Sequence, residues 1–114
     1  MDINSPEAFN AYREKMNDRI IAEKHKVLNR FWSLDGAAYE ANHLDAKTKE
    51  MLGLVASLVL RCDDCIKYHL GKCAELNVTT NELMDIMAIG NLVGGSICIP
   101  HTRRAIEYWD QLHS

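Results

Sequence analysis

The sequence predicts an all-α fold. Apolar side chains recur at spacings of three and four residues along most of the chain, as in amphipathic helices. Capping residues and prolines divide the chain into about six segments of helical length. No stretch shows sustained two-residue alternation between turn residues, so we expect no sheet. The 114 residues suffice for one compact domain, 1–114, with short connections between helices.

The first two helices are expected in the N-terminal third of the chain. Residues 5–7, Ser-Pro-Glu, combine a capping hydroxyl, a proline at the first helical position and an acid in the first turn. Apolar spacing then continues the helix from about Pro6 into the mid-twenties. A second helix is expected over residues 29–41, with an interruption near Asp35-Gly36.

The third helix carries the most apolar run of the chain. Asp45 is a suitable N-cap for a helix over residues 46–60. From residue 51 to residue 60 this helix is apolar on nearly every face, which is typical of a helix surrounded by others. A chain of this length offers little cover, so we expect partner subunits to supply part of it.

Three more helices complete the predicted fold. The fourth is expected at about residues 62–77, and a capping box of Thr79 with Glu82 opens the fifth. A glycine pair ends the fifth helix. The last helix is expected over residues 96–112, where Pro100 either kinks it or starts it.

Composition and charge exclude several classes of function. The net charge of −3 and an aromatic content of 7% argue against a nucleic-acid surface. The apolar run at 51–60 is too short to span a bilayer, which takes roughly 20 residues. Residues 1–10 show no basic and apolar pattern of a secretory signal, so we expect a cytoplasmic protein without membrane or nucleic-acid partners.

The chain has four cysteines, and two of them are spaced C-x-x-C: Cys62 and Cys65. In a reducing compartment such a pair is more often redox-active or metal-binding than a static crosslink. At a helix start, unpaired N–H groups and the helix dipole favour thiolate. The pair can therefore close and reopen a disulfide, holding two electrons reversibly.

His69 lies one helical turn after Cys65. Its imidazole can take the Cys65 proton and can protonate a leaving oxygen. Spacing thus makes Cys65 the candidate attacking thiol and Cys62 the resolving one. Asp63 and Asp64 oppose this by raising the pKa of nearby thiols, and Arg61 could offset part of their charge.

Zinc binding is the alternative for the same segment. The spacing C-x2-C-x3-H-x3-C would join Cys62, Cys65, His69 and Cys73 in a Cys3His set. Three of those ligands would lie on one continuous helix, which is unusual for tetrahedral closure. We therefore prefer no metal, and interpret Cys73 and Cys98 as small apolar core residues.

Glu50 and His101 have two interpretations each. Glu50 opens the apolar run and could pair with a histidine there, although spacing alone favours a solvated glutamate. His101, after Pro100, is either a surface or capping histidine or a second proton carrier near the thiols. Arg103-Arg104 is expected to form a solvated face.

Glu50, eleven intervening residues, and then Cys62-x-x-Cys65-x-x-x-His69 form a fairly specific pattern. This pattern resembles the carboxymuconolactone decarboxylase superfamily, most of all its AhpD-like alkylhydroperoxidase branch. The resemblance covers about residues 45–112, which we expect to be the core of the domain.

The resemblance implies an all-helical fold that forms trimers or hexamers, with the site in a crevice near subunit contacts. It also implies a peroxidase cycle without a cofactor. Cys65 would attack a small hydroperoxide, Cys62 would condense with the resulting sulfenic acid, and His69 and Glu50 would form a proton relay. A dithiol reductant or a redox partner protein would then reduce the disulfide.

One position departs from the AhpD pattern, which has a histidine immediately before the second cysteine. Here that residue is Asp64, which should make the thiol less acidic. We hypothesise that His101 partly replaces the missing imidazole. Three other functions stay open: disulfide exchange with a partner protein, decarboxylation of a lactone acid, and a zinc-stabilised or purely structural oligomer.

Overall fold

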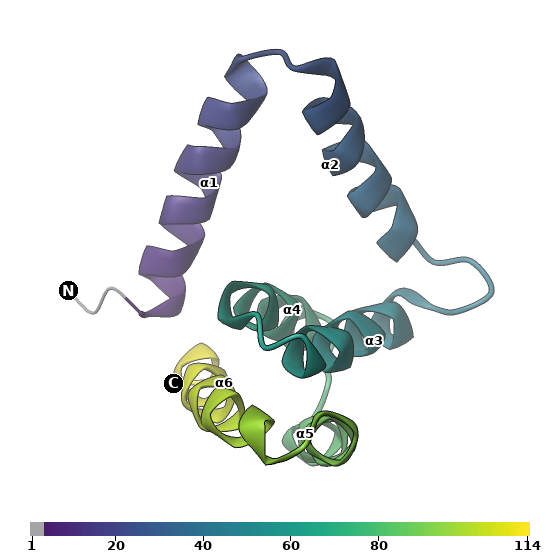
Figure 1. Ribbon diagram of the computed structural model, residues 1–114, viewed down its shortest axis with the longest axis vertical. Helices are drawn as coiled ribbons and strands as arrows, with labels where there is room; N and C mark the ends of the chain where they lie inside the picture. Colours follow the sequence, from purple (N-terminus) through teal and green to yellow (C-terminus); the bar gives the residue numbers. More distant parts are fainter. Residues whose placement is uncertain (1–3) are drawn as a thin grey trace. The chain divides into compact units, whose positions relative to one another are not determined.

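The computed structural model describes residues 4–114, which contain no strand and form six α-helices with one 3-10 turn (Figure 1). The all-α prediction is therefore confirmed. The elements in chain order are α1 (Pro6–Ala22), α2 (Lys26–Tyr39), α3 (Ala46–Val59), α4 (Asp63–Glu75), α5 (Thr80–Gly94), the 3-10 turn η1 (Ser96–Cys98) and α6 (Ile99–Leu112). Within the described chain, no helix is both long enough and apolar enough to cross a bilayer.

The helices group into two compact units, one ending at Glu40 and the other spanning Ala41–Ser114. The first unit is the α1–α2 hairpin, in which Ser5 Oγ caps α1 by accepting from the Ala8 N–H at 3.2 Å. Helix α2 has no buried residue. It begins at Lys26, three residues before the predicted start, and it runs without a break through Asp35-Gly36. The expected interruption is thus wrong.

The second unit holds the core. Helix α3 packs against α4 and α5, and α4 also packs against α6 (Figure 1). The largest side chains of this core have at most 2% exposure, and they are Trp109, Leu54, Leu58, Ile66, Leu70 and Leu83. Trp109 also donates its indole N–H to Thr80 Oγ1 at 3.0 Å, which ties α6 to the start of α5.

The apolar run in α3 is divided between the core and the surface. Leu54 and Leu58 are fully buried, whereas Leu52 is 51% exposed and Leu60 is 76% exposed. Helix α5 has exposed apolar residues of its own, of which Leu92 is the most exposed at 85%. The expectation that partner subunits cover such side chains stays a prediction.

Two junctions set the position of α6. Gly95 ends α5 with φ of 88°, a left-handed conformation that favours glycine. The turn η1 follows, and α6 then begins at Ile99 with Pro100 in its first turn, where a missing N–H costs nothing. Pro100 therefore starts the last helix and does not kink it.

Candidate functional site

The C-x-x-C pair lies at the first turn of α4, as the sequence predicted. Cys62 is the N-cap residue, and its Sγ accepts from the Cys65 backbone N–H at 3.3 Å. A disulfide joins Cys62 to Cys65, whose Cα atoms are 5.3 Å apart. Cys65 is exposed and Cys62 is half-buried, so Cys65 is the sulfur that an external molecule reaches more easily.

A buried carboxylate–histidine pair lies behind this turn. His69 on α4 and Glu50 on α3 are 7% and 5% exposed, and His69 Nδ1 lies 2.7 Å from Glu50 Oε2. A carboxylate oxygen accepts, so His69 Nδ1–H donates and Nε2 is the ring nitrogen left for proton transfer. The alternative of a solvated Glu50 is wrong.

A second carboxylate–histidine pair connects α4 to α6. Asp63 directly follows Cys62, and its two oxygens have separate partners. Its Oδ1 is 2.7 Å from His101 Nδ1, and its Oδ2 accepts from Arg104 Nε at 3.0 Å. Since His101 Nδ1–H donates to the carboxylate, the 3.2 Å approach of Arg104 to the same nitrogen is a packing contact between two donors.

This second pair changes the charge at the start of α4. Partial burial raises the pKa of Asp63, but the hydrogen bond from His101 and the charge of Arg104 outweigh it and hold the pKa below its ordinary value. Arg104, not Arg61, therefore balances Asp63. Arg104 is exposed, as predicted, but it also bonds Asp63, and His101 is not a simple surface or capping residue.

The connection between Asp63 and Arg104 was not predicted from the sequence. A weak signal was present, because His101 and Arg104 are three residues apart and share one face of α6. The partner on α4 could not be identified, since 41 residues separate Asp63 from Arg104. Whether His101 also serves the thiols as a proton carrier stays a prediction.

The two remaining cysteines are buried and free, as expected of apolar core residues. Burial raises the pKa of the Cys73 thiol to about 12, and the negative charge of Glu50 adds to the effect. Cys98 Sγ lies 3.6 Å from the Leu58 carbonyl oxygen, which its thiol can donate to. Among residues 4–114, no three His, Cys, Asp or Glu side chains are grouped to hold a metal ion.

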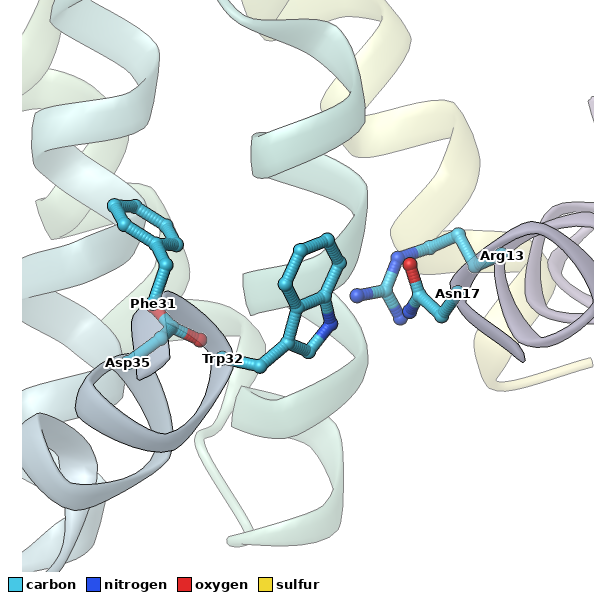
Figure 2. Close-up of a pocket in the computed structure, with 5 residues that line it drawn as sticks. All are labelled: Arg13, Asn17, Phe31, Trp32 and Asp35. Carbon is cyan, nitrogen blue, oxygen red and sulfur yellow. The ribbon is translucent and has the colours of Figure 1, made fainter. Parts of the chain in front are cut away.

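A separate pocket lies in the α1–α2 hairpin. Figure 2 shows Arg13 and Asn17 of α1 on one side, and Phe31, Trp32 and Asp35 of α2 on the other. Its volume is about 200 Å³. Trp32 is partly exposed. None of the five contributes to the C-x-x-C turn.

Comparison with known proteins defines the class to which this fold and this dithiol turn belong. The model of the carboxymuconolactone decarboxylase family matches residues 25–108. The chain is a member of that family.

Several relatives agree with this assignment. Two crystal structures of one Thermotoga maritima protein are 44% identical to this chain. The first covers 92% of both chains with a TM-score of 0.90, and the second covers 92% of this chain and 89% of the other with a TM-score of 0.88. The second is described as a carboxymuconolactone decarboxylase family protein with a possible role in antioxidative response.

Two more distant relatives complete the comparison. A family member from Legionella pneumophila, solved in its apo form, has 23% identity, a TM-score of 0.81 and coverage of 93% of this chain and 97% of its own. It supports the fold alone. An uncharacterised Cupriavidus necator protein is 25% identical over 88 residues, covering 77% of this chain and 78% of the relative.

Proposed function

We propose that this protein is a thiol-dependent peroxidase that reduces small hydroperoxides through Cys62 and Cys65. The observation that carries the proposal is the joined C-x-x-C pair at the start of α4, one turn before a buried His69–Glu50 pair. The Thermotoga maritima relative, with its possible antioxidative role, supports the same class of chemistry.

The oxidative step starts from the reduced dithiol. His69 accepts the Cys65 proton, and the Cys65 thiolate attacks the outer oxygen of the hydroperoxide. The O–O bond breaks, Cys65 becomes a sulfenic acid, and the leaving alkoxide takes the proton back from His69 to form the alcohol. Glu50 fixes the ring orientation and stabilises the imidazolium that forms between these two transfers.

The cycle closes through Cys62. Its thiolate attacks the Cys65 sulfenic acid, a disulfide forms, and hydroxide leaves as water after protonation. A dithiol then reduces the disulfide and becomes a disulfide itself, so that two electrons pass from the dithiol to the hydroperoxide. The steps need no cofactor and no metal.

The test is hydroperoxide consumption with dithiothreitol as the electron donor. We expect turnover by the wild type, and loss of turnover in Cys65→Ser because the attacking sulfur is gone. Cys98→Ala is the matched control, since it also removes one thiol but leaves the C-x-x-C turn intact. An unchanged rate in Cys65→Ser would remove the proposed nucleophile, and rapid disulfide exchange without peroxide turnover would favour a protein disulfide oxidoreductase.

The proposal includes the oligomeric state, the location and the electron donor of the protein. We propose a homo-oligomer in the cytoplasm, because apolar side chains such as Leu92 and Leu60 are exposed in the single chain and call for subunit contacts. The family resemblance favours a trimer or hexamer. A dithiol or a redox partner protein supplies the electrons there.

A further inference from the structure

The pair formed by Asp63 and His101 has no part in the cycle described above, yet it adjoins Cys62 directly. Asp63 is the first residue of α4, and Cys62 is its N-cap. His101 and Arg104 reach this carboxylate from α6 with distances of 2.7 and 3.0 Å. Two side chains of the last helix thus fix the residue that follows the resolving cysteine.

The charges around Cys62 determine how readily its thiol ionises. A carboxylate beside a thiol disfavours the thiolate, and α4 opens with both Asp63 and Asp64. Asp64 is exposed, and no described side chain forms an ion pair with it. Arg104 balances the charge of Asp63, so Asp63 cancels less of the positive end of the α4 dipole. That positive end stabilises a thiolate at Cys62.

We propose that Arg104 and His101 are positioning residues that act through Asp63 to stabilise the thiolate of Cys62 and so make the Cys62–Cys65 disulfide easier to reduce. This inference rests on the proposed dithiol cycle. In this proposal, two side chains of α6 tune the reduction potential of the Cys62–Cys65 disulfide. The peroxide steps described above do not set that potential.

The step on which they act is the reduction of the disulfide by a small dithiol. One thiolate of the reductant attacks the exposed Cys65 Sγ, the S–S bond breaks, and the electron pair leaves on Cys62 Sγ. That sulfur already accepts the Cys65 N–H at 3.3 Å, so the departing thiolate has a donor in place. The second reductant thiol then displaces Cys65, both protons pass to the protein thiols, and the reductant becomes a disulfide.

The experiment is the redox equilibrium of the full-length protein in glutathione buffers at pH 7. Arg104→Gln leaves Asp63 unbalanced, and we expect the equilibrium constant for reduction to fall about threefold, the range of one exposed ion pair. That change corresponds to a potential about 14 mV more negative, and it should shrink in high salt. Arg103→Gln is the matched control, since Arg103 is exposed and bonds no carboxylate among the described residues.

A double variant distinguishes a charge effect from a loss of structure. Asp63→Asn with Arg104→Gln removes both charges, and we expect its potential to return toward that of the wild type. Equal potentials for Arg104→Gln and Arg103→Gln would overturn the proposal while leaving the dithiol cycle intact. A wild type that never forms the Cys62–Cys65 disulfide in any buffer would overturn both the proposal and the proposed function.

Discussion

Glu50 is a carboxylate within the apolar packing between α3 and α4, and it is held there by His69. Burying a carboxylate away from water costs free energy unless a partner hydrogen-bonds it. A buried carboxylate–histidine pair is therefore a candidate for a functional role. Its 2.7 Å bond fixes one tautomer and one orientation of the imidazole. In the proposed cycle, this fixed orientation prepares His69 to accept and return the proton of Cys65.

Replacing Glu50 by Gln tests that role. The amide keeps a hydrogen-bond acceptor for His69 Nδ1 but cannot stabilise an imidazolium, so we expect peroxide turnover to fall about 100-fold. Steady-state kinetics with a small hydroperoxide measure the loss. Glu75→Gln is the control, because Glu75 only pairs with Lys72 on the surface, at 3.5 Å. Equal rates in the two variants would contradict the relay.

Cys73 predicts how the stability of the protein depends on alkaline pH. Its thiol has a pKa of about 12 in the folded protein and an ordinary value of 9.0. A pKa raised by folding stabilises the native state fully below pH 9, and this contribution is lost as the pH rises toward 12. The loss is at most about 4 kcal/mol.

Urea unfolding between pH 8 and pH 12 measures this contribution. We expect the free energy of unfolding of the wild type to fall more steeply than that of Cys73→Ala, whose cavity cost does not depend on pH. Other groups titrate in the same range, and the difference between the two proteins isolates the thiol. Parallel curves would show that Cys73 is not kept neutral by burial.

At the scale of elements, the sequence predicts most helices because their signals are local. The Thr79–Glu82 capping box has both of its hydrogen bonds, at 2.8 and 3.1 Å, and Asp45 accepts from the Thr48 N–H at 2.8 Å. Each signal acts within three residues and needs no tertiary partner. The same holds for the C-x-x-C turn, which was placed correctly at the start of its helix.

The errors at this scale have physical causes. Helix α2 begins earlier than expected because His25, an uncommon cap, accepts from the Leu28 N–H at 3.3 Å through its ring. Gly36 does not break this helix, since a single glycine costs only about 1 kcal/mol. The Glu50–His69 pair, 19 positions apart, was expected only through the family resemblance, and the Asp63–Arg104 contact was beyond prediction because no periodicity relates residues 41 positions apart.

At the scale of the whole molecule, several large apolar side chains are not buried within the single chain. Leu92 is 85% exposed, Val93 is 70% exposed and Phe31 is 65% exposed. Exposed apolar side chains that gather in a large patch usually mark surfaces between protein molecules. The sequence had indicated such surfaces through the apolar run of α3, and only part of that run is buried in the folded chain.

The central claim is that Cys62 and Cys65 cycle between dithiol and disulfide when a hydroperoxide is present. Counting thiols in the denatured protein, before and after one equivalent of hydroperoxide, tests it most directly. The account predicts that four thiols become two, because Cys73 and Cys98 stay buried and free. Four thiols remaining after the hydroperoxide has been added would contradict the account.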